Sequence, residues 1–140
     1  MSYGFYGWET ADIRDSRGLT PCDYYDLFSR AWCAETCAPA LRKDWSPKNN
    51  TLGQCSITAF LMQDLWGGKV WGVPLPGGGV HCFNEVSGCV FDLTSEQFGD
   101  NPPDFNDRTE QDRSVHFADG DKFARYQLLK SRLMPLIPAE

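Results

Sequence analysis

Two short apolar segments separated by Ser87-Gly88 constrain the fold of this chain more than any other feature. The segments VHCFNEV (80–86) and CVFDLT (89–94) have the composition of strands, and a serine–glycine pair between them is a two-residue hairpin signal. The sequence therefore predicts an antiparallel hairpin in which Val86 lies opposite Cys89.

This register predicts that a histidine and an aspartate lie side by side. Phe83 then faces Asp92, and because side chains two apart share a face, His81 lies on the same face as Asp92. Diagonal neighbours on adjacent strands have Cβ atoms about 7–8 Å apart, within reach of an imidazole and a carboxylate. Asn84 falls on the opposite face, and a one-residue bulge would reverse the arrangement.

An apolar helix pattern begins directly after Gly53-Gln54-Cys55. Its apolar residues recur at helical spacing, and Gly67-Gly68 is typical of a helix end; the residues are Ile57, Phe60, Leu61 and Leu65. A helical pattern also covers 19–45, where Pro39 ends or kinks it, and KVWGVP (69–74) indicates a strand. From the capping residue Asp119 to 133 we expect an amphipathic helix with four inward residues, Phe123, Tyr126, Leu129 and Leu133. The predicted class is α+β, with N-terminal helices, a helix that carries Cys55, and an antiparallel sheet.

The position of Cys55 favours a catalytic hypothesis. A thiol at a helix N-terminus has a lowered pKa, and the free N–H groups there stabilise an oxyanion. With His81 as base and Asp92 as the group that orients it, the three residues form a predicted Cys-His-Asp triad for acyl transfer through a thioester. Gln54 is a candidate amide donor for the oxyanion. No cofactor is needed, because nucleophile and base are both side chains.

Composition and charge restrict the cellular compartment and the classes of binding partner that we expect. The 140 residues suit one domain, 1–140, and the net charge of −6 without a basic stripe argues against nucleic acid. The first residues lack the pattern of a secretory signal, and no stretch approaches the roughly 18 apolar residues of a membrane span. We therefore expect a cytoplasmic chain with reduced thiols, no membrane partner, and a small-molecule or peptide substrate.

Three segments resemble the YunG-like family of small bacterial and phage-associated proteins: GQCSITAFLMQDLWGG (53–68), VPLPGGGVHCFNEVSG (73–88) and FDLTSEQF (91–98). More broadly, the order of Cys, His and Asp is similar to the papain-like and transglutaminase-like superfamily of cysteine hydrolases. The resemblance implies that fold and the triad roles of Cys55, His81 and Asp92, but no substrate. The chain departs from the family pattern at Cys82, where an aromatic residue is expected.

Two other functions remain open from the sequence. Cys33 and Cys37, four apart on the predicted helix, could bind zinc together with Cys82 and Cys89, although the spacing is not that of common zinc sites. Alternatively the chain is a noncatalytic binding or assembly module on the same fold. The sequence does not indicate whether the acyl group passes to water or to an amine. It also does not indicate the oligomeric state.

Three further residues are candidates for substrate binding. Trp45 and Trp71 are either core residues or walls of a substrate cleft. Gly79 ends the glycine-rich segment PLPGGG, which indicates either a simple connection or a flexible lip beside His81; the segment lacks the Lys-Ser/Thr of a phosphate loop.

Overall fold

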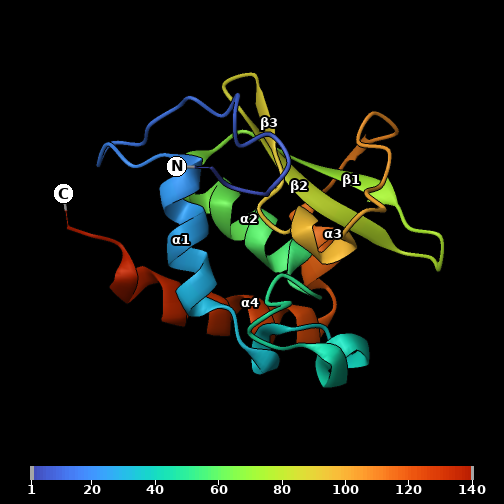
Figure 1. The fold of residues 1–140 in the computed structure, drawn as a ribbon. Helices are drawn as coiled ribbons and strands as arrows, with labels where there is room; N and C mark the ends of the chain where they lie inside the picture. Colours follow the sequence, from blue (N-terminus) through green and yellow to red (C-terminus); the bar gives the residue numbers. More distant parts are fainter. Residues whose placement is uncertain (1, 140) are drawn as a thin grey trace.

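The computed structural model describes residues 2–139, which form a mixed α+β structure (Figure 1). The helices are α1 (Pro21–Ala31), α2 (Cys55–Trp66), α3 (Arg113–Phe117) and α4 (Gly120–Leu133). The strands are β1 (Lys69–Pro74), β2 (Val80–Val86), β3 (Cys89–Phe91) and β4 (Thr109–Glu110). Short 3-10 turns are η1 (Ala34–Thr36), η2 (Pro39–Asp44), η3 (Ser95–Phe98) and η4 (Met134–Leu136). The predicted class is confirmed.

The strands form one antiparallel sheet in the order β3-β2-β1-β4. The predicted hairpin register is confirmed, since Val86 pairs with Cys89. Ser87 and Gly88 have positive φ angles of 52° and 81°. A two-residue turn with both central residues in this region matches the right-handed twist of its strands, which explains why a glycine follows the serine.

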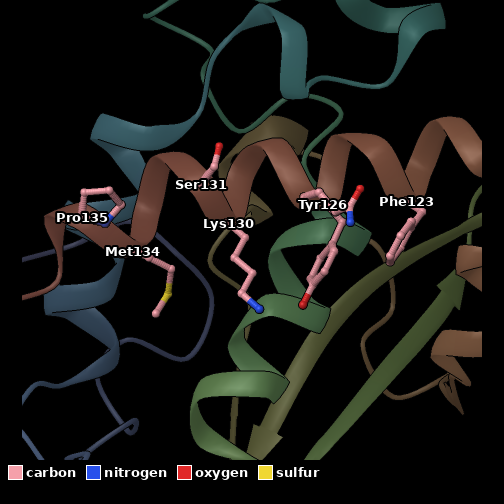
Figure 2. Close-up of a pocket in the computed structure, with 7 residues that line it drawn as sticks. Phe123, Tyr126, Lys130, Ser131, Met134 and Pro135 are labelled. Atoms are coloured by element: carbon pink, nitrogen blue, oxygen red, sulfur yellow. The ribbon is translucent and has the colours of Figure 1, made fainter.

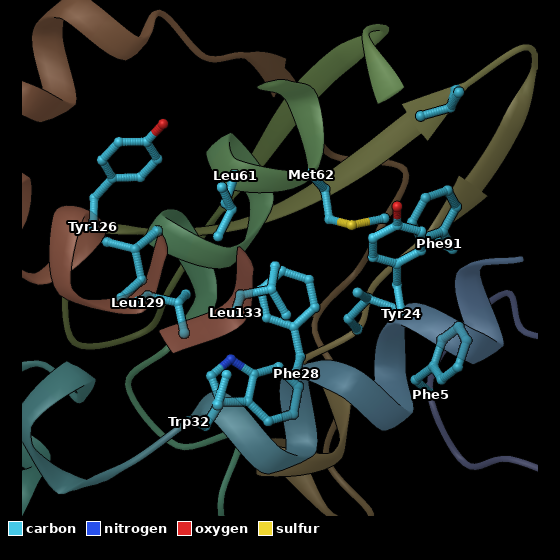
Figure 3. Packing of buried hydrophobic residues seen from close by; sticks show 14 of the residues in the cluster. Phe5, Tyr24, Phe28, Trp32, Leu61, Met62, Phe91, Tyr126, Leu129 and Leu133 are labelled. Carbon is cyan, nitrogen blue, oxygen red and sulfur yellow. The ribbon is translucent and has the colours of Figure 1, made fainter. Parts of the chain in front are cut away.

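Helix α2 lies between the sheet and α4 (Figure 1). Its residues from Ser56 to Met62 are all buried, because one side of the helix contacts β2 and the other contacts α4. Aromatic and aliphatic side chains from α1, α2 and α4 fill the main core (Figure 3); they include Tyr24, Phe28, Leu61, Met62, Leu129 and Leu133. Burial on both sides fixes the first turn of α2 relative to the start of β2.

The helix predicted over 19–45 is wrong beyond Ala31. Thr20 and Asp23 form a capping box, but the backbone leaves helical geometry at Trp32 (ψ 139°). The Trp32 indole there donates a hydrogen bond to Oγ1 of Thr58 on α2 at 2.9 Å. The remaining segment forms only η1 and η2.

Arginine side chains bind the backbone carbonyls of this segment that a longer helix would have paired. Nε of Arg132 lies 2.6 Å from the carbonyl oxygen of Ala31, and Nε of Arg42 lies 2.9 Å from that of Ala34. Because Arg132 belongs to α4, the end of α1 depends partly on a contact that local sequence does not reveal.

Two smaller expectations also differ from the structure. The strand predicted over 89–94 ends at Phe91, and Asp92 forms a bridge with Tyr6 of the N-terminal segment. The Asp92 carboxylate accepts the backbone N–H of Thr94 at 3.0 Å, which turns the chain away from the sheet. On α4, Tyr126, Leu129 and Leu133 are buried as predicted, but Phe123 is 39% exposed.

No helix among residues 2–139 has the length and apolarity that crossing a membrane requires.

Candidate active site

Cys55 is the first residue of α2 and remains half-buried. The preceding residue, Gln54, is the N-cap, but its side chain does not cap the helix. The first N–H groups of the helix therefore keep their hydrogen-bonding capacity beside the Cys55 thiol, together with the positive end of the helix dipole.

His81 and Asp92 form a buried pair. Nε2 of His81 lies 2.5 Å from Oδ2 of Asp92, and each side chain is 1% exposed. The expectation that register places the two side chains within hydrogen-bonding reach is confirmed. It holds even though β3 ends one residue before Asp92.

Backbone and side-chain contacts fix the Asp92 carboxylate. Its Oδ1 atom accepts hydrogen bonds from the backbone N–H of Thr94 at 3.0 Å and from the Thr94 hydroxyl at 3.2 Å. The backbone N–H of Asp92 donates to the carbonyl oxygen of Tyr6 at 2.9 Å. With Oδ1 occupied in this way, Oδ2 points to His81.

The Cys55 thiol interacts with the same imidazole. Burial by itself raises the pKa of Cys55, but the hydrogen bond with His81 and the imidazolium charge outweigh burial and lower it below its ordinary value. The backbone N–H of Cys82 contributes in the same direction. These interactions favour the thiolate.

His81 shows the complementary change. Burial lowers its pKa, but the charge of Asp92, the hydrogen bond to that carboxylate and the contact with Cys55 together raise it to about 10. A lowered thiol pKa beside a raised imidazole pKa favours a thiolate–imidazolium pair at neutral pH.

Thr94 and Phe98 are two site residues that were not predicted from the sequence. The Phe98 ring meets the His81 ring edge-on, with centroids 4.6 Å apart, and covers it from η3. The spacing of Asp92 and Thr94 is a signal for an aspartate turn that could have identified Thr94. Phe98 carried no such signal, because its contact with His81 depends on the path of η3.

Gln54 is completely buried, and its amide is only partly paired. Nε2 donates to the carbonyl oxygen of Cys33 at 3.1 Å, while Oε1 has no partner among the described residues. One N–H of the side-chain amide is therefore already used by the protein, and the second remains.

The three candidate substrate-binding residues lie in different surroundings. The Trp45 indole donates to the carbonyl oxygen of Asn50 at 2.9 Å, and the Trp71 indole donates to Glu85 at 3.0 Å; both rings are half-buried. Gly79 is exposed in the loop before β2, with a φ of 76°. Gly79 is thus the nearest of the three to His81 in sequence, two residues before it.

The remaining cysteines lie in separate parts of the described structure. Among residues 2–139, no three His, Cys, Asp or Glu side chains are grouped so that they could hold a metal ion. Cys33 and Cys37 flank the 3-10 turn η1 instead of sharing a helix face. Cys82, which replaces the expected aromatic residue, is buried with Ala59 and Val70.

A separate hollow of about 750 Å³ follows α4 (Figure 2). Phe123, Tyr126 and Lys130 lie along it, and the Tyr126 hydroxyl donates to Asp64 of α2. Asp64 follows Cys55 by nine residues, or about 13 Å along the helix axis. This hollow is therefore distinct from the Cys55 site.

Comparison with known proteins identifies one family. A family model described as YunG protein matches residues 20–137. The chain is also similar to the YunG protein of Bacillus subtilis (strain 168), with 37% identity over 54 residues, which cover 39% of this chain and 46% of that protein. The chain thus aligns with about half the length of this curated relative. No solved structure matches the chain.

Proposed function

The chain belongs to the YunG family, and we propose a function for it from the chemistry of its own side chains. We propose that the protein is a cysteine-dependent hydrolase or acyltransferase that acts on an amide or peptide-like bond. The observation that carries the proposal is that Cys55 and Asp92 contact the same buried imidazole, that of His81, from separate parts of the chain.

In the first step, the Cys55 thiolate attacks the carbonyl carbon of the substrate and forms a tetrahedral oxyanion. The His81 imidazolium then gives its proton to the leaving amine, the C–N bond breaks, and a thioester to Cys55 remains. Because Nε2 of His81 is engaged with Asp92, Nδ1 is the nitrogen that serves the thiol and the leaving group. Asp92 holds that tautomer and stabilises the imidazolium.

In the second step, neutral His81 takes a proton from water, which attacks the thioester and releases the acid. Cys55 leaves as the thiolate, and His81 returns to the imidazolium form, so that the starting pair is restored. An amine in place of water gives transfer instead of hydrolysis. Water is our default acceptor.

The N-terminus of α2 is the proposed oxyanion site. The backbone N–H of Cys55 points from a helix end that its N-cap side chain leaves free. The second N–H of the Gln54 amide is a further donor, because only one is used by Cys33. A buried amide held by a backbone carbonyl keeps a fixed orientation, which suits this task.

We also propose a fold type, a domain organisation and a cellular location for the chain. A helix that opens at a cysteine and packs on an antiparallel sheet bearing histidine, with aspartate after the next strand, is similar to the papain-like and transglutaminase-like arrangement. We propose that 1–140 is a single domain of this type, that it works in the cytoplasm, and that its substrate is a small molecule or peptide.

Thiol labelling tests the proposal directly. Iodoacetamide should alkylate Cys55 faster than the other five cysteines at neutral pH, as read by peptide mass spectrometry. His81→Ala should slow that reaction, whereas His116→Ala, at the other histidine, should not. Equal labelling of all six cysteines would overturn the proposal.

A second measurement tests acyl transfer. Incubation with p-nitrophenyl acetate should release p-nitrophenol in a burst and leave one acetyl group on Cys55, and Cys55→Ala should abolish both. Fast alkylation without acetylation would show an activated thiol in a noncatalytic module.

A further inference from the structure

We propose that a cavity beside the His81–Asp92 pair binds an organic cation, so that the substrate carries an ammonium or guanidinium group near the bond that is cleaved. This inference rests on the proposed function and adds a substrate class to it. The cavity has a volume of about 430 Å³. That size is within the range of small-molecule sites.

An exposed aromatic platform forms one wall of the cavity. Tyr6 and Phe105 both line it, and their rings stack with centroids 3.9 Å apart. Phe105 is 7% exposed, but Tyr6 is 43% exposed, so one ring face stays available. Tyrosine rings attract ammonium and guanidinium groups through their quadrupole.

Two carboxylates, those of Glu96 and Asp100, complete the chemistry of the cavity. Among the residues that the structure describes, no lysine or arginine lines this cavity. One oxygen of Glu96 accepts the Tyr25 hydroxyl, which leaves the other oxygen. The Asp100 carboxylate has no hydrogen-bond or ion-pair partner among residues 2–139. An aromatic face beside unpaired negative charge is a complementary environment for an organic cation.

The 3-10 turn η3 joins this cavity to the proposed active site. Ser95 and Glu96 of η3 line the cavity, while Phe98 of η3 contacts the His81 ring. Tyr6 also connects the two, since its carbonyl oxygen accepts the N–H of Asp92 and its own N–H donates to Ser95 Oγ at 2.8 Å. The cavity and the His81–Asp92 pair thus share Tyr6 and η3 as neighbours.

The chemistry of the groups that line the cavity determines which kind of cation it binds. Calcium and magnesium bind through oxygen ligands, whereas the aromatic wall of this cavity favours an organic ammonium or guanidinium group. An amine held by carboxylates is protonated and is therefore not a nucleophile. The bound cation is accordingly a recognition group of the acyl donor, and not the acyl acceptor.

Methanethiosulfonates of different charge test the proposal on the complete chain. Each reagent forms a disulfide with the Cys55 thiolate and releases methanesulfinate, so the reagents differ only in the group that they transfer. We expect the trimethylammonium-ethyl reagent to label Cys55 about tenfold faster than the neutral methyl reagent, and the sulfonatoethyl reagent to be slowest. Asp100→Asn should remove most of this preference.

Asp107→Asn is the matched control, because Asp107 is exposed, outside the cavity, and gives the same change in net charge. Tyr6→Leu should also reduce the ratio of the cationic to the neutral labelling rate. An unchanged ratio in Asp100→Asn, or an equal loss in Asp107→Asn, would overturn the inference.

Binding to Cys55→Ala separates this inference from the proposed function. NMR titration with N-acetyl-lysine methylamide should shift signals of Tyr6 and Phe105, and Asp100→Asn should weaken the effect several-fold. If the neutral reagent shows no activation of Cys55, the proposed function fails while this titration still reports on the cavity. No shift at Tyr6 or Phe105 would refute the cation site itself.

Discussion

Nε2 of His81 lies 2.5 Å from Oδ2 of Asp92, and this contact joins a strand to the turn that follows the next strand. Although burial lowers the pKa of His81, Asp92 and Cys55 raise it to about 10. The charge of one carboxylate therefore influences the protonation state of the imidazole and, through it, of the Cys55 thiol.

The first prediction concerns the role of Asp92. Asp92→Asn removes the carboxylate charge, so the pKa of His81 should fall and that of Cys55 should rise. At about pH 6, alkylation of Cys55 by iodoacetamide should then slow about tenfold for each unit by which the pKa of Cys55 rises. Above about pH 9 the rate should recover, because the thiol ionises there in both proteins. Asp107→Asn is the control, and the same loss in both variants would contradict the assignment.

The second prediction compares the two histidines. His81 should remain protonated at about pH 8, whereas His116 should be neutral. Burial and the neighbouring Lys122 lower the pKa of His116 below 6.5. Ring ¹⁵N chemical shifts measured across a pH series, assigned with His116→Ala, check this difference. Neutral His81 at that pH would argue against the thiolate–imidazolium pair.

The raised pKa of His81 also has a consequence for stability. A histidine whose folded pKa exceeds its ordinary value of 6.5 stabilises the fold fully below that pH. The contribution is lost as pH rises toward the folded pKa. Denaturant unfolding of Cys55→Ala, in which Cys55 no longer titrates, should show this decline above about pH 6.5, and Cys55→Ala/Asp92→Asn should show less of it.

The third prediction concerns Thr94. Thr94→Val removes the hydroxyl that donates to Oδ1 of Asp92 but keeps the backbone N–H donor. We expect a loss of about 1–3 kcal/mol in the free energy of unfolding, because the acceptor is a buried carboxylate. The Cys55 alkylation profile should also move to higher pH. Thr94→Ser, which retains the hydroxyl, should restore both, and failure of that rescue would show that the methyl group matters instead.

The fourth prediction tests the hairpin turn. Gly88→Ala should lower the free energy of unfolding by about 1–2 kcal/mol, since Gly88 has a φ of 81°. The added Cβ has open space around it, so any loss comes from backbone conformation. Gly120→Ala, at an equally open helix start, is the control and should be neutral or slightly stabilising. Equal stability of the two variants would contradict this explanation.

Local patterns were sufficient for several elements that build the candidate site. Ser87-Gly88 specified the turn, and period-two alternation then put His81 and Asp92 on one face. Gly67 marked the end of α2, where its φ is 78°. These features depend on the backbone sterics of a few neighbouring residues, and a sequence pattern reports such sterics directly.

Other features were beyond any local pattern. The end of α1 is set in part by Trp32, which binds Thr58, and by Arg132, which binds the carbonyl oxygen of Ala31. Likewise, Phe98 reaches His81 and Tyr6 bridges Asp92 only because the chain folds back on itself.

The sequence by itself thus determined the α+β class, the hairpin register and the placement of Cys55 at a helix start. The tertiary structure decided that this thiol meets the His81 imidazole, that the pair is buried enough to shift both pKa values, and that an acidic aromatic cavity adjoins it. The physical reason is that turns and alternation arise from interactions between neighbours in the chain. Burial and pairing of charges arise from groups that only the folded chain brings together.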